Sequence, residues 1–397
     1  MELRPGYKQT EVGVIPEGWD VSTSAEVFVV TAGGDVDPKR SQAYRDETYC
    51  YPIYSNALTN RGLYGYCSYA DHHSGSITVT ARGTLGVAIF REHPYTAIGR
   101  VLVLRPKREM AGGFFAEFIN NRVKFPIEST GVPQLTAPKV STHSLPVPPI
   151  PEQRAIAGAL GDVDALLGAL TQLIAKKRDL RQAAMQQLLA GQTRLPGFSE
   201  NWKTVTAGEI GKFRGGNGFP LRYQGASGGT YPYFKVSDMN TKGNETFMIT
   251  SSNWISEVIR KALGATAFPA NSIVFAKVGA AIFLERKKIL ARASCLDNNM
   301  TAFVLDDGRA DCRFMHHLML SAKLGDLVAT TALPSLSARQ LSEISLGLPP
   351  LPEQIAIAAV LSDMDAELTA LEARLAKTRA LKQGMTQELL TGRTRLL

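Results

Sequence analysis

The chain has 397 residues, of which 44% are hydrophobic and 20% are charged, so it is long enough for two compact domains with connecting helices. Its longest apolar stretches fall far short of the roughly 18 residues that cross a bilayer, and its start lacks a signal-peptide core. We therefore expect a cytoplasmic protein with no membrane partner. The net charge of +8 favours a polyanionic partner, although basic proteins without one are also common.

The first block of the chain, which we expect to form a domain over residues 1–146, has the composition of a sheet with turns. Runs of β-branched and aromatic residues such as GSITVTARGTLGVAIF, from Gly75 to Phe90, are bounded by glycine, asparagine and proline, as strands joined by turns are. The shorter stretch FFAEFINN, from Phe114 to Asn121, predicts a helix. The block therefore indicates a mixed α/β domain in which sheet predominates.

A long helix is predicted over the next segment, residues 147–195. Pro148 and Pro149 exclude helix where they stand, whereas Pro151 suits the first helical position. Gly191 can adopt the left-handed conformation that ends a helix, which leaves about 40 helical residues and a length of roughly 60 Å. Apolar residues follow one another at spacings of four and three, the pattern of a coiled-coil seam: Ile156, Leu160, Val163, Leu167, Leu170 and Ile174.

The second half of the chain repeats this plan, with a block over residues 196–347 and a helical segment over 348–397. The run NSIVFAKVGAAIFLE, from Asn271 to Glu285, again predicts strands with turns. At an offset of 201 residues, the segment from Val147 to Leu195 is identical to a second copy at 27 of 49 positions, without a gap. The second copy has its own seam: Ile357, Leu361, Met364, Leu368, Leu371 and Leu375.

Two apolar seams of equal length and phase predict that the two helices pair with each other. One helix leads the chain from the first block to the second and the other returns, so we favour antiparallel packing with an approximate twofold axis. The alternative is two separate helices, each packed on its own domain.

At this point the chain resembles a known family. The PPxPEQ entry to each helix, the repeat of the whole unit and the Thr-x-x-Pro-x-Leu motifs that start at Thr130 and Thr331 are similar to those of the specificity subunits of type I restriction-modification systems. The resemblance covers essentially the whole chain. It implies two target recognition domains joined by two paired helices, each domain reading one half of an asymmetric, bipartite sequence in double-stranded DNA.

The resemblance also implies partners. Two DNA methyltransferase subunits would carry S-adenosylmethionine, and optional restriction and translocase subunits would use ATP and Mg. Two recognition domains held apart by a stiff helix pair suit half-sites about one turn of the DNA helix, roughly 34 Å, apart. The resemblance implies a gap of base pairs between the half-sites that neither domain recognises. Two alternatives stay open: the DNA-reading chain of a related system that combines restriction and methylation in one partner, and a coiled-coil scaffold that binds no DNA.

Candidate DNA contacts are polar residues on expected turns, where side chains can reach bases or phosphates. In the first block these are Asn56, Asn60, Arg61, Arg82 and Thr84. In the second block they are Lys235, Ser237, Asp238, Asn240 and Lys277. Arginine and lysine can read guanine and asparagine can read adenine, yet most such residues on protein surfaces are simply solvated.

The duplicated helices are the natural docking surfaces for two identical partner subunits. Outward positions on the first helix are expected to contact the partner, as are their mates on the second. They are Gln153, Asp162, Asp164 and Arg178, matched by Gln354, Asp363, Asp365 and Arg379. The competing interpretation is that all eight are ordinary solvated helix positions.

No catalytic residue and no metal site are predicted. Four widely spaced cysteines, Cys50, Cys67, Cys295 and Cys312, are too few for a disulfide scaffold and lack the close pairing of zinc motifs, so we expect free thiols. Neither a Gly-x-x-x-x-Gly-Lys phosphate loop nor an Asn/Asp-Pro-Pro-Tyr/Phe methyltransferase loop occurs. The Glu-x-Lys spacing at Glu285-Arg286-Lys287 lacks a preceding Pro-Asp, and we expect a solvated turn there. Catalysis would then come from partner subunits.

Overall fold

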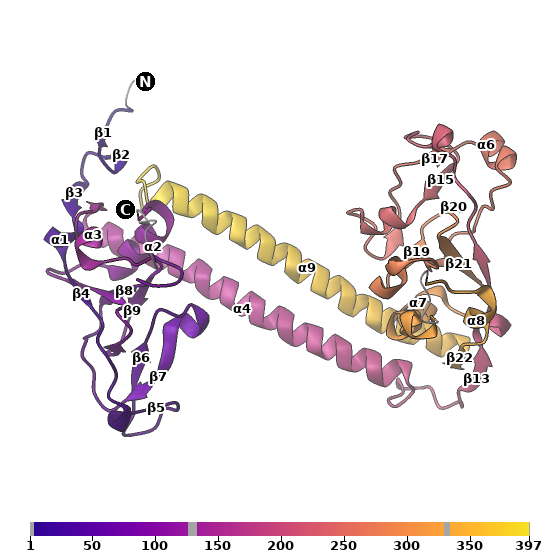
Figure 1. Ribbon diagram of the computed structural model, residues 1–397, viewed down its shortest axis with the longest axis horizontal. Coiled ribbons are helices and arrows are strands. Elements are labelled where there is room, and N and C mark those ends of the chain that lie inside the picture. Colours follow the sequence, from indigo (N-terminus) through magenta and orange to yellow (C-terminus); the bar gives the residue numbers. More distant parts are fainter. Residues whose placement is uncertain (1–3, 126–132, 329–333, 397) are drawn as a thin grey trace. The chain divides into compact units, whose positions relative to one another are not determined.

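The computed structural model describes residues 4–125, 133–328 and 334–396, and the chain forms two compact units. Unit 1 comprises residues 1–172 with 373–397, and unit 2 comprises residues 173–372. Each unit contains one mixed α/β domain and one half of each long helix (Figure 1). The predicted α/β class with two sheet-containing domains is confirmed.

The domain of unit 1 is built on two four-stranded sheets. The first has the order β4-β11-β8-β9, with all neighbours antiparallel, and the second has the order β10-β6-β7-β5. Their strands are β4 (Phe28–Ala32), β5 (Ser41–Gln42), β6 (Tyr51–Tyr54), β7 (Leu63–Cys67), β8 (Ser76–Val79), β9 (Ala88–Arg91), β10 (Thr96–Ala97) and β11 (Leu102–Pro106). Two further pairs are β1 (Tyr7–Thr10) with β2 (Gly13–Pro16) and β3 (Asp20–Thr23) with β12 (Ser144–Val147). The helical elements are α1 (Ser24–Val27), α2 (Gly112–Arg122), α3 (Ala137–Ser141), η1 (Pro38–Arg40) and η2 (Thr59–Gly62).

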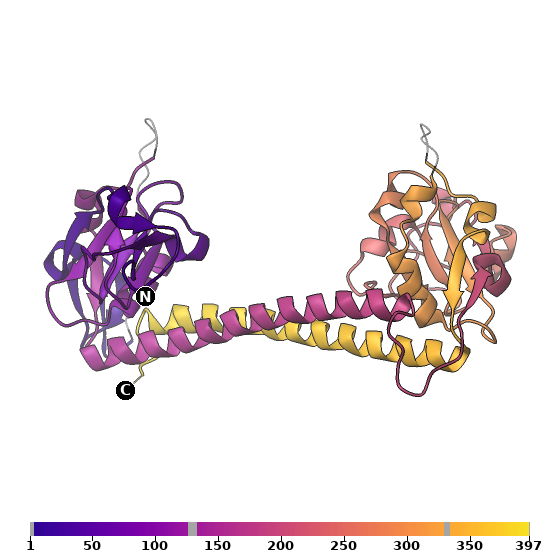
Figure 2. The same cartoon turned by 90° about the horizontal axis from the view of Figure 1, so that it is seen from below.

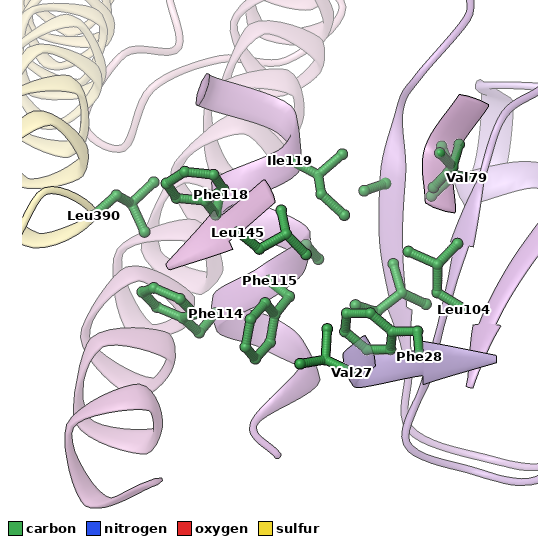
Figure 3. Packing of buried hydrophobic residues seen from close by; sticks show 14 of the residues in the cluster. Val27, Phe28, Val79, Leu104, Phe114, Phe115, Phe118, Ile119, Leu145 and Leu390 are labelled. Atoms are coloured by element: carbon green, nitrogen blue, oxygen red, sulfur yellow. The ribbon is translucent and has the colours of Figure 1, made fainter. Parts of the chain in front are cut away.

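The core of unit 1 lies between the first sheet, α2 and the long helices. Phe114, Phe115 and Phe118 of α2 are buried in a single apolar cluster that reaches Phe28 on β4 and Leu390 after the second long helix (Figure 3). Phe28 and Phe115 meet edge to face with ring centroids 5.4 Å apart. Aromatic side chains bury large apolar areas, so this cluster fixes the sheet to the helix pair.

The domain of unit 2 has a related arrangement, with five strands in its main sheet and three in its second sheet. Its main sheet has the order β14-β21-β18-β19-β16 and its second sheet the order β17-β15-β20. The strands are β14 (Gly211–Gly215), β15 (Tyr231–Phe234), β16 (Phe247–Met248), β17 (Trp254–Ile255), β18 (Ile273–Ala276), β19 (Lys287–Leu290), β20 (Cys295–Leu296) and β21 (Met300–Leu305), with β13 (Lys203–Thr206) paired to β22 (Ser345–Leu348). The helical elements are α5 (Ala207–Ile210), α6 (Glu257–Ala262), α7 (Cys312–Ser321), α8 (Ala338–Ser342), η3 (Leu221–Tyr223), η4 (Val236–Asn240), η5 (Ala280–Leu284) and η6 (Leu324–Leu327).

The long helices are α4 (Ile150–Leu189) and α9 (Leu351–Leu389), each beginning one residue before the predicted proline. Gly191 and Gly392 follow their ends with φ of 65° and 66°, which confirms the predicted left-handed stops. All twelve seam residues are buried or half-buried. In neither unit is the seam left uncovered, as a coiled-coil pairing predicts.

Ion pairs in each unit show that α4 and α9 run antiparallel, as both views indicate (Figures 1 and 2). In unit 1 Asp164 of α4 bonds Lys382 of α9 at 2.7 Å. At the offset of 201 residues, the position equivalent to Asp164 is Asp365 of α9, and the position equivalent to Lys382 is Arg181 of α4. These two residues form an ion pair in unit 2. The same contact is therefore made once in each unit with the roles of the two helices exchanged, and the separate-helix alternative is wrong.

Helix α4 is long enough, and over one window of 18 residues apolar enough with a mean hydropathy of 1.2, to cross a bilayer by length and composition alone. This differs from the sequence expectation, which counted uninterrupted apolar runs. The apolar stretch contains Asp162 and Asp164, and its buried side chains form a stripe on one side of the helix. A stripe of this kind is the pattern of a helix that packs against another helix.

The Glu285-Arg286-Lys287 segment is not the solvated turn that the sequence suggested. The Lys287 side chain is fully buried and pairs with Glu285, and its ammonium also donates to the Ala322 carbonyl at 2.8 Å. The Glu285 carboxylate accepts the backbone N–H groups of Leu324 and Gly325. Burial lowers the pKa of Lys287. A lysine in a predicted strand is expected to be exposed, whereas Lys287 is buried and, through Glu285, links β19 to η6.

Candidate nucleic-acid interface

The candidate DNA contacts of unit 1 lie on two of three loops that the Asn56 side chain joins. Its Oδ1 accepts the backbone N–H of Ala81 at 2.7 Å, and its Nδ2 donates to the carbonyl of Gly99 at 2.6 Å. We call residues 56–62, 81–86 and 99–100 the Asn56 loops. They follow β6, β8 and β10. Strands β6 and β10 pair in one sheet, whereas β8 lies in the other sheet, and the hydrogen bond from Ala81 to Asn56 joins its loop to the other two. Asn56 was predicted to contact DNA, but its amide oxygen and nitrogen both form hydrogen bonds to the backbone of the neighbouring loops.

The other predicted residues of unit 1 are exposed on the Asn56 loops. Asn60 and Arg61 lie on the first loop, and Arg82 and Thr84 lie on the second. The third loop carries Arg100, an exposed residue with φ of 64° that the sequence reasoning missed. The sequence contained a signal for Arg100, because it stands next to Gly99 on an expected turn, as Arg82 stands next to Gly83. Three exposed arginines on adjoining loops form a positive surface suited to phosphate or guanine.

The candidates of unit 2 divide between exposed and buried positions. Ser237 and Asn240 are exposed on η4, while Lys235 and Lys277 are half-buried. Asp238 is only 3% exposed, and its carboxylate accepts the backbone N–H of Lys235 at 2.7 Å. Asp238 was therefore wrongly expected to face DNA, because a carboxylate three residues after a helix cap is drawn back onto the backbone.

The structure also relates loops that the sequence does not align. Leu135 donates its backbone N–H to Ala81, and Leu336 donates to Lys277, so Lys277 occupies the place of Ala81. These leucines end the Thr-x-x-Pro-x-Leu motifs, whose first residues Thr130 and Thr331 lie outside the described residues. The Lys277 ammonium lies against Gly215 at the end of β14. A lysine here and an alanine in the other domain make the two loop surfaces chemically different.

Asn217 has a bracing role in unit 2 comparable to that of Asn56. Its Nδ2 donates to the Gly264 carbonyl at 3.2 Å, and its Oδ1 accepts the Thr266 N–H at 2.9 Å. The Tyr233 hydroxyl donates to the Asn217 carbonyl at 2.8 Å. The sequence reasoning missed Asn217, because nothing in the surrounding sequence distinguishes a bracing asparagine from a solvated one.

Each long helix begins at a buried carboxylate in a cluster that occurs once in each unit. In the Glu152 cluster of unit 1, Glu152 accepts from Trp19 Nε1 at 2.8 Å and from two nitrogens of Arg395. In the Glu353 cluster of unit 2, Glu353 accepts from Trp202 Nε1 at 3.2 Å and from two nitrogens of Arg194. Each cluster joins the start of one helix to the segment that follows the end of the other.

Gln153 and Gln354 were predicted to face outward toward a partner, and the structure contradicts this. Both side chains are buried. Gln153 accepts the Ala111 N–H and donates to the Pro148 carbonyl, while Gln354 accepts the Asp311 N–H and donates to the Pro349 carbonyl. The glutamine after the buried glutamate thus anchors the helix start to its own domain.

The remaining partner candidates lie along the sides of the helices. Asp162, Asp363 and Arg379 are exposed. Asp164 and Asp365 take part in the ion pairs between α4 and α9, and Arg178 pairs with Glu372. Asp162 and Asp363 therefore remain the better candidates for contact with another molecule, because their carboxylates face solvent.

The four cysteines are free thiols in the structure. Over residues 4–125, 133–328 and 334–396, no group of three or more His, Cys, Asp and Glu side chains could hold a metal ion. Burial raises the pKa of Cys295 and of Cys312 to about 11, so neither is activated as a thiolate.

Comparison with protein families gives a match to the type I restriction modification DNA specificity domain over residues 16–177 and 199–378. A putative type I specificity subunit of Mycoplasma pneumoniae is 29% identical over 174 residues, covering 44% of this chain and 47% of that protein. This chain therefore spans about half the length of that relative. A putative type I restriction enzyme MjaX specificity subunit of Methanocaldococcus jannaschii is 23% identical over 430 aligned positions, covering 98% and 97% of the two chains.

Solved structures share the fold. A type I restriction-modification S subunit from M. genitalium superposes with a TM-score of 0.64 at 14% identity, covering 98% of each chain. A chain from a study of complex assembly in the type I system superposes with a TM-score of 0.50 at 17% identity, covering 95% of this chain and 99% of that chain.

Proposed function

Because this chain belongs to the family of type I restriction modification DNA specificity domains, we propose that it is the sequence-recognition subunit of a type I restriction-modification system. The observation that carries the proposal is that the family match covers both α/β domains. The main sheets share the antiparallel order β4-β11-β8-β9 and β14-β21-β18-β19, yet the two domains present different polar side chains on their loops. Two related folds with different loop surfaces are suited to reading two different half-sites.

The proposed target is an asymmetric, bipartite sequence in double-stranded DNA. The exposed residues of the Asn56 loops would contact one half-site, and the region of Lys235, Asn240 and Lys277 would contact the other. Arginine and lysine side chains supply phosphate contacts and guanine readout, and asparagine supplies adenine readout. The chain itself would be non-catalytic.

Catalysis would come from cytoplasmic partner subunits. Two DNA methyltransferase subunits would bring S-adenosylmethionine, and restriction and translocase subunits would bring ATP and Mg. Docking of two identical subunits is supported by Asp162 and Asp363, which are equivalent positions of the repeat and are exposed in their respective units. A methyltransferase that acts on a base must flip it out of the duplex, which requires such a complex to be held in register on its target.

The two long helices would set the unread gap between the half-sites. Each is a continuous helix of 40 or 39 residues, with a length of about 60 Å. A paired helix is stiff compared with a loop of equal length, so the gap would be fixed rather than variable.

Sequencing of modified DNA would test the proposal. The chain is expressed with its neighbouring methyltransferase gene in a host without DNA methylation, and N6-methyladenine is mapped with and without the chain. A split motif that appears only with the chain is the expected result. Absence of any motif although the complex assembles would reject DNA targeting and favour a scaffold protein.

A further inference from the structure

The loop that carries Asn60 and Arg61 has a backbone that other groups must hold in place. Asn60, Arg61 and Gly62 have φ of 48°, 54° and 84°, three consecutive left-handed residues. This conformation is disfavoured for arginine, because its Cβ approaches the following carbonyl. Gly62 accepts no side chain, since an added Cβ would lie 2.8 Å from the carbonyl oxygen of Ser55. Non-glycine residues in this region persist where surrounding contacts impose them, and they concentrate at functional sites.

Arg91 supplies such contacts from beneath the loop. Its side chain is buried, with the residue 3% exposed, although it is an arginine on β9. Nη2 donates to the carbonyl of Arg61 at 2.9 Å, and Nε donates to Thr78 Oγ1 at 2.9 Å. The guanidinium carbon lies 3.4 Å from the ring centroid of Tyr54. The planar fork thus joins the left-handed turn to two strands of the domain.

The charge of Arg91 is not neutralised within the described part of the chain, where it forms no ion pair with a carboxylate. Burial lowers the pKa of Arg91 to about 10, so the guanidinium is still charged at neutral pH. A buried cation without a counter-ion is costly for stability. An adjoining surface with exposed Arg61, Arg82 and Arg100 adds further positive charge. This accumulation costs folding energy but favours a polyanion that approaches the loops.

We infer that Arg91 is a positioning residue for DNA recognition, which holds Asn60 and Arg61 in the conformation that reads one half-site. The inference rests on the proposed function and deepens it. Asn56 fixes which loops adjoin, and Arg91 fixes the backbone of the loop that carries the two exposed readers. Preorganisation of this kind matters for discrimination between bases, because direct readout depends on the direction of donors and acceptors.

The substitution Arg91→Lys tests this inference. Lysine keeps the charge, but its one nitrogen cannot occupy both positions from which Nε and Nη2 of Arg91 donate to Thr78 and to the Arg61 carbonyl. Competition binding uses the split target found by methylation mapping and duplexes with one base changed in either half-site. We expect discrimination to fall about tenfold in one half-site only, corresponding to one lost bidentate contact. Discrimination in the other half-site should not change.

Two controls separate positioning from a general structural role. Arg105→Lys alters an exposed arginine at the far end of β11 from the Arg100 loop, and it should leave both half-sites unchanged. In a chain that already carries Asn60→Ala and Arg61→Ala, Arg91→Lys should have no further effect on discrimination, because the groups that it positions are gone. If Arg91→Lys does not fold, Thr78→Val removes one acceptor of the guanidinium and should produce a smaller change in the same half-site.

Several results would overturn the inference. Arg91→Lys could leave both half-sites unchanged, or it could weaken every duplex by the same factor, as loss of stability alone would. A full effect in the Asn60→Ala, Arg61→Ala chain would show that Arg91 does not act through this loop. Absence of any sequence preference in the unmodified complex would instead reject the proposed function, and this inference with it.

Discussion

Unit 1 should be sensitive to the loss of either ion-pair partner in the Glu152 cluster, and Glu152→Gln tests this. Glutamine keeps the length of the side chain and one oxygen that can accept from Trp19. It removes the negative charge that two nitrogens of Arg395 contact. The Glu152 side chain is fully buried, so water cannot reach the face of Arg395 that contacts it. After the substitution, water can solvate Arg395 only on the part of its side chain that is already exposed.

The magnitude follows from the burial of the two partners. Removal of one member of a fully buried ion pair costs about 3–5 kcal/mol. The Arg395 side chain is 35% exposed and can partly return to water, so we expect a loss of about 2–3 kcal/mol in the free energy of unfolding. For a unit of about 200 residues, this corresponds to a decrease in Tm of about 5–10 °C.

Hydrogen exchange and thermal unfolding would measure the effect. Exchange should accelerate at the start of α4 and in the segment that follows α9, where Arg395 lies, while peptides of unit 2 keep their protection. Glu353→Gln is the matched control, and it should give the reverse pattern by releasing Arg194. A loss below about 0.5 kcal/mol, the level of an exposed ion pair, would refute the reasoning. Equal acceleration in both units after Glu152→Gln would refute it as well.

Three further predictions concern the helices and unit 2. Insertion of seven residues at equivalent positions of α4 and α9 lengthens each helix by about 10.5 Å. Methylation mapping should then find a gap between the half-sites that is longer by about three base pairs, with both half-sites unchanged. An unchanged gap would contradict the role of the helices in setting the spacing. Burial lowers the pKa of His317 to about 4, so unit 2 should lose up to about 3 kcal/mol as pH falls from about 6.5 to 4, because the unfolded chain takes up the proton first. Urea titrations of His317→Leu should show a flatter dependence over that range, and an equally steep one would exclude His317 as the cause. Asp162→Lys combined with Asp363→Lys should weaken copurification of the methyltransferase, and undiminished recovery would remove both aspartates from the docking surface.

The sequence by itself determined the frame of this protein. The proline entry, the spacing of Ile156, Leu160 and the later seam residues, and the glycine stops specify two long helices, because these signals act within a few residues of the chain. The repeat at an offset of 201 residues then specified their pairing, since two equal apolar seams have no better cover than each other. The antiparallel direction followed from the order of the blocks along the chain.

Only the tertiary structure decided which polar residues are available to a ligand. Asn56, Asp238, Gln153 and Gln354 have the residue types of binding sites, yet their side chains satisfy backbone groups that folding brings beside them. Arg91 has the residue type of a surface position and is buried. These outcomes depend on contacts between residues far apart in sequence. A buried polar group that makes no hydrogen bond is costly, so such a side chain bonds to the backbone groups that folding brings beside it. Local pattern therefore specified the helices, and long-range hydrogen bonding selected which polar residues remain available to a ligand.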